Sequence, residues 1–275
     1  MKTRIISGAV GIALLALVLW LHQSPLYPLA LAAIGGLAAY EMANAQKMKS
    51  ESFFISVSAI YIFISIFLPR LGFISYFMSL FAMYILLTFA YIVICQTYAL
   101  FRHKSLELTR YYTALAYIVL ICSAMLSLSA IEFTGGKTAI PHVILTCMGA
   151  WVADSGAYFA GTFLGKHKLC PEISPKKTVE GLIGGAVANA VVFFLFAILK
   201  NRLYDSSSSP VIYAIVGIVC CFLGLLGDLT ASLIKRDSGI KDYGNIMPGH
   251  GGAMDRFDSL IYIAPFMYFI FGGGL

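Results

Sequence analysis

The chain has 275 residues, of which 60% are hydrophobic and only 12% are charged, and its mean hydropathy is +0.86. A soluble core of this length does not require so much apolar sequence, so the composition excludes an ordinary soluble protein and favours a polytopic membrane protein. The formal net charge is +6, and we expect no nucleic-acid partner.

Apolar runs of about 20 residues, the length that crosses a bilayer as a helix, follow one another along the chain. The first run, 5–21, follows two basic residues but precedes no small-x-small cleavage site, so we expect a retained span and not a signal peptide. The fourth run is long enough for one tilted helix or two short ones. The sequence predicts an all-α polytopic integral membrane protein with about nine transmembrane helices, near 4–21, 25–43, 53–69, 73–101, 111–131, 138–164, 182–199, 210–234 and 257–273.

The basic residues are distributed unevenly among the loops between these helices. If the N-terminus is cytoplasmic, 15 of the 19 Lys and Arg residues fall in inside segments. Inside loops carry such an excess of Lys and Arg, so we expect the N-terminus inside and the C-terminus outside. Two long inside loops, 165–181 and 235–256, hold eight of these 15 charges. We therefore expect an N-terminal transmembrane scaffold, 1–110, and a C-terminal catalytic region, 111–275, with these two cytoplasmic loops.

Four aspartates lie in or at the ends of the later predicted helices. An ionised carboxylate inside a bilayer costs several kcal/mol, so it normally faces a polar cavity and has a partner. Asp154 is followed by Ser155, Gly156 and Ala157, small residues that permit close approach of helices. The four positions are Asp154, Asp228, Asp255 and Asp258.

The spacing of these residues places several of them on shared helix faces. Asp228, Ser232 and Lys235 fall at i, i+4 and i+7, which makes one polar stripe. Asp255 and Asp258 fall at i and i+3, at the cytoplasmic start of the last predicted helix. Carboxylates at a helix N-terminus also suit the helix dipole, so capping is an alternative explanation for this pair. Capping explains one of the two carboxylates well, and the two together less well.

A shared cation site is the most economical explanation for all four carboxylates. A buried ion pair that holds helices together is the alternative for Asp154 and Asp228. The six cysteines lie mostly inside apolar runs without C-x-x-C or zinc-type spacing, so the hard carboxylate oxygens favour Mg²⁺ over zinc.

The basic residues of the two loops suit a phosphate chain, because Mg²⁺ bound by few carboxylates completes its shell with water and phosphate oxygens. Gly251 and Gly252 let backbone N–H groups approach an anion closely. His250 is a proton shuttle, a phosphate hydrogen-bond donor or a solvated turn residue. No GxxxxGK[ST] sequence occurs, which excludes a P-loop. The basic candidates are Lys176, Lys177, Lys235, Arg236 and Lys241, each of which by itself is also explained as a positive-inside residue.

Three segments between residues 150 and 260 carry a family resemblance. The stretch 232–258 has the pattern S-x-x-K-R-x-x-x-x-K-D-x-G-x-x-x-P-G-H-G-G-x-x-D-R-x-D, and 174–181 reads S-P-K-K-T-V-E-G. With the run D-S-G-A-Y-F-A-G at 154–161, these motifs closely resemble those of the phosphatidate cytidylyltransferases, or CDP-diacylglycerol synthases. Residues 1–110 match only as generic apolar spans. Departures at Val179, Met247 and Ala253 remove no charged group.

The resemblance implies transfer of CMP from CTP to phosphatidate, which gives CDP-diacylglycerol and pyrophosphate for phospholipid biosynthesis. It also implies a multi-pass, homodimeric enzyme of a bacterial-type inner membrane, with Mg²⁺ and a second, monovalent cation such as K⁺. Expected catalytic residues are Asp228, Asp255, Lys235, Arg236, Lys241 and His250. Expected substrate-binding residues are Ser174, Lys176, Lys177, Glu180, Asp242, Gly251, Gly252 and Arg256. Asp228 and Asp255 are the first expected metal ligands, followed by Asp258 and Asp154.

Other functions share part of this pattern. Intramembrane aspartates also mark the ion paths of cation-coupled transporters, but such a path needs polar residues on both membrane sides and the outside loops here are sparse in charge. A polyprenol kinase or a CDP-archaeol synthase would use the same basic loops, and only the motifs favour phosphatidate. The D-x-x-D-G…G-x-x-x-D-x-x-x-D pattern of CDP-alcohol phosphotransferases is absent. A purely structural membrane protein would not require four such aspartates.

Overall fold

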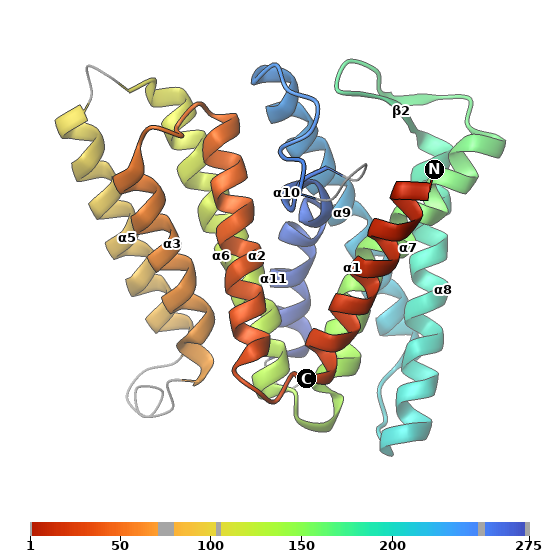
Figure 1. The fold of residues 1–275 in the computed structure, drawn as a ribbon. Helices are drawn as coiled ribbons and strands as arrows, with labels where there is room; N and C mark the ends of the chain where they lie inside the picture. Colours follow the sequence, from red (N-terminus) through yellow and green to blue (C-terminus); the bar gives the residue numbers. More distant parts are fainter. Residues whose placement is uncertain (1, 71–79, 103–105, 247–250, 273–275) are drawn as a thin grey trace. The chain divides into compact units, whose positions relative to one another are not determined.

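The computed structural model describes residues 2–70, 80–102, 106–246 and 251–272 (Figure 1). Almost all of the regular structure in these ranges is helical, as predicted. The α-helices are α1 (Lys2–Trp20), α2 (Leu26–Ala45), α3 (Ser52–Phe67), α5 (Leu80–Arg102), α6 (Leu108–Thr134), α7 (Ala139–Leu164), α8 (Val179–Tyr204), α9 (Pro210–Asp237), α10 (Met254–Phe257) and α11 (Leu260–Phe271). Two short 3-10 helices, η1 (Leu68–Arg70) and η2 (Gly136–Thr138), and two strands, β1 (Lys168–Cys170) and β2 (Ser174–Thr178), complete the list.

Each of the nine predicted ranges contains a helix, and in the described residues seven helices are long and apolar enough to cross a membrane. The described part of range 73–101, from residue 80, is one continuous helix, and residues 73–79 lie outside the described ranges. Helix α11 has 12 residues, which at ~1.5 Å per residue is shorter than the ~30 Å hydrocarbon core. The all-α polytopic membrane fold is therefore confirmed, while the number of spans and the orientation stay predictions.

The outer faces of these helices are strongly apolar. Phe89 of α5, Val187 and Leu195 of α8 and Ile215 of α9 are large apolar side chains that are exposed in the chain by itself. Lipid covers such faces, and helices satisfy their own backbone hydrogen bonds within it. These exposed apolar side chains account for part of the high hydrophobic content from which the membrane fold was predicted.

The chain divides into two compact units. The first unit contains residues 1–133 with 238–257, and the second contains residues 134–237 with 258–275. These units are defined by packing, whereas the predicted division at residue 110 is one of roles and stays a prediction. The signature stretch 232–258 contributes residues to both units.

Helix α6 ties the first unit together. The Tyr27 hydroxyl of α2 donates a hydrogen bond to the Leu128 carbonyl of α6 over 3.2 Å. The Ser129 hydroxyl of α6 donates to the Ile66 carbonyl of α3 over 2.9 Å. In an apolar medium such interhelical hydrogen bonds fix the register of neighbouring helices.

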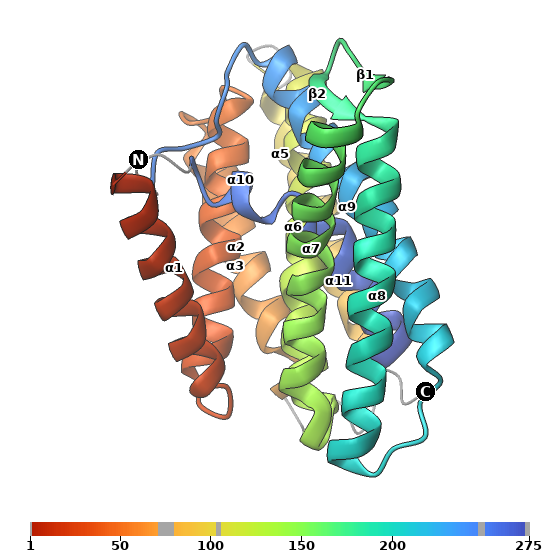
Figure 2. The same cartoon turned by 90° about the vertical axis from the view of Figure 1, so that its right-hand side faces the viewer.

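In the second unit, α7, α8 and α9 pack side by side through small residues (Figure 2). A Cβ on Gly156 would lie 2.7 Å from that of Ala188, so the predicted close approach at Gly156 is confirmed. The buried Asn189 of α8 donates from Nδ2 to the Gly149 carbonyl of α7 and the Gly217 carbonyl of α9, over 2.8 and 3.1 Å. Close packing at glycines and this one amide therefore hold the three helices in register.

The loop 165–181 contains structure that the sequence did not predict. Strands β1 and β2 form an antiparallel hairpin in which Lys168 pairs with Thr178 and Cys170 with Ser174 (Figure 2). Helix α8 begins directly after this hairpin, three residues before the predicted start at 182, because Thr178 is its N-cap. The Thr178 hydroxyl accepts a hydrogen bond from the Gly181 N–H over 3.1 Å, which satisfies one of the free donors of the first turn.

Candidate functional site

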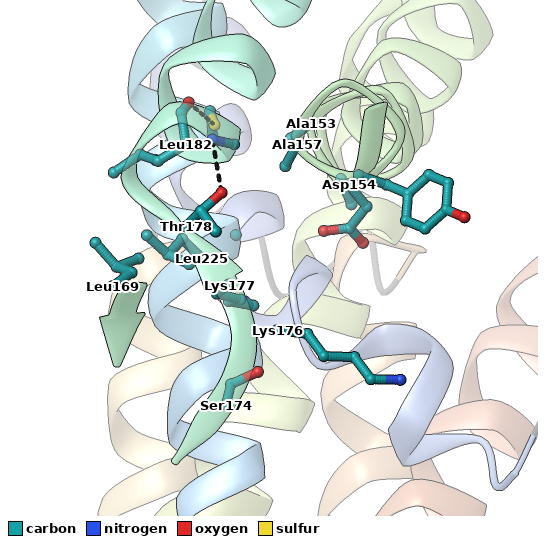
Figure 3. Close-up of a pocket in the computed structure, with 15 residues that line it drawn as sticks. Ala153, Asp154, Ala157, Leu169, Ser174, Lys176, Lys177, Thr178, Leu182 and Leu225 are labelled. Carbon is teal, nitrogen blue, oxygen red and sulfur yellow. Dashed lines mark hydrogen bonds between the residues drawn. The ribbon is translucent and has the colours of Figure 1, made fainter. Parts of the chain in front are cut away.

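The second unit contains a pocket of about 240 Å³, lined by α7, α8, α9 and the hairpin. Leu169, Leu182 and Leu225 contribute an apolar wall. Asp154 of α7 lies across the pocket from strand β2, which supplies the polar side of the lining (Figure 3). Four predicted site residues line this one pocket: Asp154, Ser174, Lys176 and Lys177.

An ion pair connects this pocket to α9. The Lys177 Nζ contacts the Asp228 carboxylate at Oδ2, and both side chains are about one quarter exposed. The Ser232 hydroxyl donates to Asp228 Oδ1 over 3.3 Å, so the predicted stripe is confirmed for these two residues. The pair joins the motif 174–181 to the polar stripe of α9.

Asp258 lies in the turn between α10 and α11, outside the long apolar helices, and belongs to the same unit as Asp228. Burial, and next the negative charge of Asp228, raise the pKa of Asp258 to about 7, while the hydrogen bond from the Ser259 N–H and then the charge of Lys235 lower it. The turn approaches α9 closely at Gly227, where a Cβ would collide with the Asp258 carbonyl oxygen and lie 3.1 Å from the Ser259 Cα. A glycine at 227 is therefore what allows the two carboxylates to lie near each other.

The carboxylates of the second unit suit one kind of metal better than others. Across the described residues, no group of three or more His, Cys, Asp or Glu side chains gathers closely enough to hold an ion by itself. Mg²⁺ normally uses one or two carboxylates and completes its shell with water and substrate phosphates, whereas a structural zinc or a calcium ion requires a fuller protein cage. The carboxylate oxygens of Asp228 and Asp258 are of the donor type that Mg²⁺ prefers, and magnesium binding stays a prediction.

Glu180, a predicted substrate-binding residue, contacts the hairpin in this structure. Its carboxylate accepts a hydrogen bond from the His167 N–H over 3.2 Å, and its Oε1 lies 2.6 Å from His167 Nδ1. The Val179 N–H donates to the His167 carbonyl over 2.9 Å. These contacts fasten the start of the hairpin to the first turn of α8.

Asp255 belongs to the first unit. Its Oδ2 accepts hydrogen bonds from the Tyr243 N–H over 2.8 Å and the Gly252 N–H over 3.0 Å. The Gly252 N–H, which the sequence offers to an anionic substrate, is thus bonded to Asp255 here. Gly251 has a φ of +86°, and a Cβ there would lie 2.9 Å from Asp255 Oδ2, so this turn requires glycine.

The remaining predicted residues lie at the surface or outside the described ranges. His250 falls outside the described residues. Those that are exposed are Arg236 at the end of α9, Lys241 and Asp242 in the segment that follows, and Arg256 in α10.

Glu41 is a buried carboxylate that the sequence interpretation passed over. It lies in α2, is 4% exposed, and accepts hydrogen bonds from the Ala253 and Met254 N–H groups. Its position inside the predicted span 25–43 is the same signal that identified Asp154 and Asp228. The interpretation of residues 1–110 as scaffold hid this signal.

Comparisons with known proteins find one matching family and several similar relatives. The model of the family described as "Cytidylyltransferase family" matches residues 2–272. A phosphatidate cytidylyltransferase of Bacillus subtilis is 32% identical over 279 residues, which cover 98% of this chain and 97% of that relative. A protein of the same name from Haemophilus influenzae is 44% identical over 122 residues, 44% of this chain and 42% of the relative. Another, from Staphylococcus haemolyticus, is 35% identical over 176 residues, 64% of this chain and 66% of the relative.

The close approach at Gly227 can be tested by adding one methyl group. We expect Gly227→Ala to lower the free energy of unfolding by about 1–3 kcal/mol, because the Cβ must displace the backbone at 258–259. Thermal unfolding in detergent measures this effect. Gly36→Ala is the matched control, since a Cβ at this α2 position meets nothing within 4 Å. Equal melting temperatures for the two variants would contradict the packing described here.

Proposed function

The chain belongs to the cytidylyltransferase family, and on this premise we propose that it transfers CMP from CTP to phosphatidate, giving CDP-diacylglycerol and pyrophosphate. The observation that carries the proposal is the pocket that Lys176, Lys177 and Asp154 line, with Asp228 paired to Lys177. The full-length similarity to a relative named for this activity supports it.

The lining of the pocket suits a reaction between one lipid and one soluble substrate. Phosphatidate is anchored in the membrane by its acyl chains, while CTP arrives from water. Apolar helix residues and a basic hairpin line the same pocket, so groups of both characters are within reach of a substrate there. A pocket that is apolar on one side and basic on the other meets the demands of both substrates.

In the proposed reaction, a phosphate oxygen of phosphatidate attacks the α-phosphorus of CTP in line. A new P–O bond forms, the bond to the β-phosphate oxygen breaks, and pyrophosphate leaves with that electron pair. The nucleophile is already anionic, so no strong general base is required. Positioning and neutralisation of charge then supply most of the rate.

The chain's own residues supply these two effects. Lys177 is held at the pocket by Asp228, and substrate phosphates offer its ammonium group a second anionic partner. Lys176 is an exposed residue of β2, so its side chain can reach and neutralise a phosphate without a change in the backbone of the strand. We assign Lys235, Arg236 and Lys241 to the same task, and His250 to hydrogen bonding with phosphate.

Mg²⁺ is the proposed cofactor, with Asp228 and Asp258 as ligands and Asp255 and Asp154 as further candidates. When bound it supplies Lewis-acid stabilisation of charge on the phosphate oxygens. A second, monovalent cation such as K⁺ stays a proposal that rests on the family resemblance.

The decisive experiment incubates purified protein with phosphatidate, labelled CTP and Mg²⁺. We expect the label to enter the lipid extract, and we expect Asp228→Asn and Asp255→Asn each to reduce this incorporation at least about a hundredfold, because each replaces a candidate carboxylate ligand of Mg²⁺ with a neutral amide. Asp205→Asn is the matched control, since Asp205 caps α8 in a left-handed conformation that asparagine also adopts.

Two results would overturn the proposal. Wild-type incorporation by Asp228→Asn would remove the role of that carboxylate. Phosphorylation of a polyprenol in place of labelling of the lipid extract would favour a polyprenol kinase.

We also propose that the protein is a homodimer of a bacterial-type inner membrane, with its N-terminus in the cytoplasm. The excess of basic residues in alternate loops supports the orientation, and the bacterial relatives support the compartment. The homodimer rests on the family resemblance.

Cys170 provides a natural test of this orientation. It lies in β1 and is half-buried, whereas the other five cysteines are buried. We expect a membrane-impermeant maleimide to label inside-out vesicles and to leave intact spheroplasts unlabelled, because loop 165–181 is predicted to face the cytoplasm. Cys170→Ser should abolish the labelling. Labelling of intact spheroplasts at Cys170 would reverse the predicted topology.

A further inference from the structure

Glu41 binds the backbone just before Asp255 with both of its carboxylate oxygens. Oε1 accepts from the Ala253 N–H over 3.1 Å, and Oε2 accepts from the Met254 N–H over 2.8 Å. Hydrogen bonds to a charged group are about twice as strong as neutral ones. The two bonds fix both the position and the rotation of the peptide units that lead into α10.

Two glycines of the segment 238–257, Gly244 and Gly252, lie against the Glu41 carboxylate. A Cβ on Gly244 or on Gly252 would collide with the Glu41 carboxylate. A side chain at either position therefore requires the Glu41 carboxylate to move. Two of the glycines in the signature stretch are therefore explained by a glutamate about 200 positions earlier in the chain and not by a ligand alone.

A second contact attaches the start of the same segment to the end of α2. The Gln46 side chain donates from Nε2 to the Ser238 hydroxyl over 3.0 Å. Gln46 is itself buried, at 2% exposed. The segment 238–257 is thus fastened to α2 at its first residue by Gln46 and near its last residues by Glu41.

The free-energy cost of placing the Glu41 carboxylate inside an apolar helix indicates that this contact has a function beyond fastening a loop. A carboxylate inside an apolar helix is expensive, and a loop of ordinary sequence can be fastened without one. Here the carboxylate immobilises Ala253 and Met254, while the Asp255 side chain binds Tyr243 and Gly252. The backbone just before Asp255 is therefore bonded to Glu41, which lies outside the segment 238–257. The Asp255 side chain is bonded to N–H groups within that segment.

We propose that Glu41 is a positioning residue for the reaction: it acts through the backbone of 252–254 to hold the Asp255 carboxylate in its working orientation. This inference rests on the proposed function for its catalytic consequence, but the anchoring itself does not. A residue of the N-terminal scaffold, 1–110, then belongs to the catalytic machinery without contacting substrate.

The first experiment uses Glu41→Gln, which keeps the length of the side chain but places an NH₂ donor against one backbone N–H. We expect hydrogen–deuterium exchange of the segment 251–257 to accelerate in the substrate-free protein. We expect kcat for CMP transfer to fall about ten- to a hundredfold, with the KM for phosphatidate changed less than about threefold, because misplacement by about 1 Å costs rates of this order. Glu51→Gln is the matched control, since Glu51 is also buried in the first unit but pairs with Arg102.

A second variant approaches the same contact from the other side. Gly244→Ala pushes a methyl group into the Glu41 carboxylate and should reproduce both effects. Asn245→Ala, at an exposed neighbouring position, should reproduce neither. This pair keeps the test valid if Glu41→Gln fails to fold.

The outcomes distinguish the anchoring of the segment by Glu41 from its role in the reaction. Unchanged exchange at 251–257 in both Glu41→Gln and Gly244→Ala would overturn the anchoring, and so would equal acceleration in Glu51→Gln. Faster exchange with wild-type kcat would overturn the positioning role alone. Absence of CMP transfer in the wild type, with faster local exchange in the variants, would overturn the proposed function and support the anchor.

Discussion

A carboxylate among apolar helices must have a partner, and most features of this protein follow from how that requirement is met. Asp228 is paired with Lys177, and Glu41 is bonded by two backbone N–H groups. Each partner lies in a different stretch of chain from its carboxylate. Asp228 therefore fastens the hairpin to α9, and Glu41 fastens the segment before α10 to α2.

The helices were predictable because a bilayer imposes a length and a composition. Apolar runs of about 20 residues have few alternatives to a spanning helix, and the polar stripe of Asp228 and Ser232 follows from helical spacing. The hairpin at 168–178 was not predictable, because its strands are three and five residues long and contain lysines and a proline. Its order comes from contacts such as Glu180 with His167, which join positions that no local pattern connects.

Features of the site that depend on tertiary contacts could not be predicted from the sequence. Lys177 belongs to the motif 174–181 and Asp228 to the polar stripe of α9, and only the folded structure shows that they meet. Glu41 was missed for a different reason. It has no motif around it, and its role appears only when the backbone at 253–254 is seen to be bonded to it. The stretch 232–258 is continuous in sequence, yet its residues are divided between two packed units, which periodicity does not reveal.

The ion pair of Lys177 and Asp228 has a consequence for the form in which the nucleotide is accepted. A nucleotide that arrives without a counterion must share Lys177 with Asp228, which leaves the Asp228 carboxylate less well compensated. A nucleotide that carries a divalent cation brings a replacement partner for Asp228 and an anionic partner for Lys177 at once. The exchange then keeps every charge compensated throughout. On the proposed function, and with Mg²⁺ as the proposed cofactor, a cation-complexed nucleotide would therefore enter beside this ion pair at a lower electrostatic cost than a bare one.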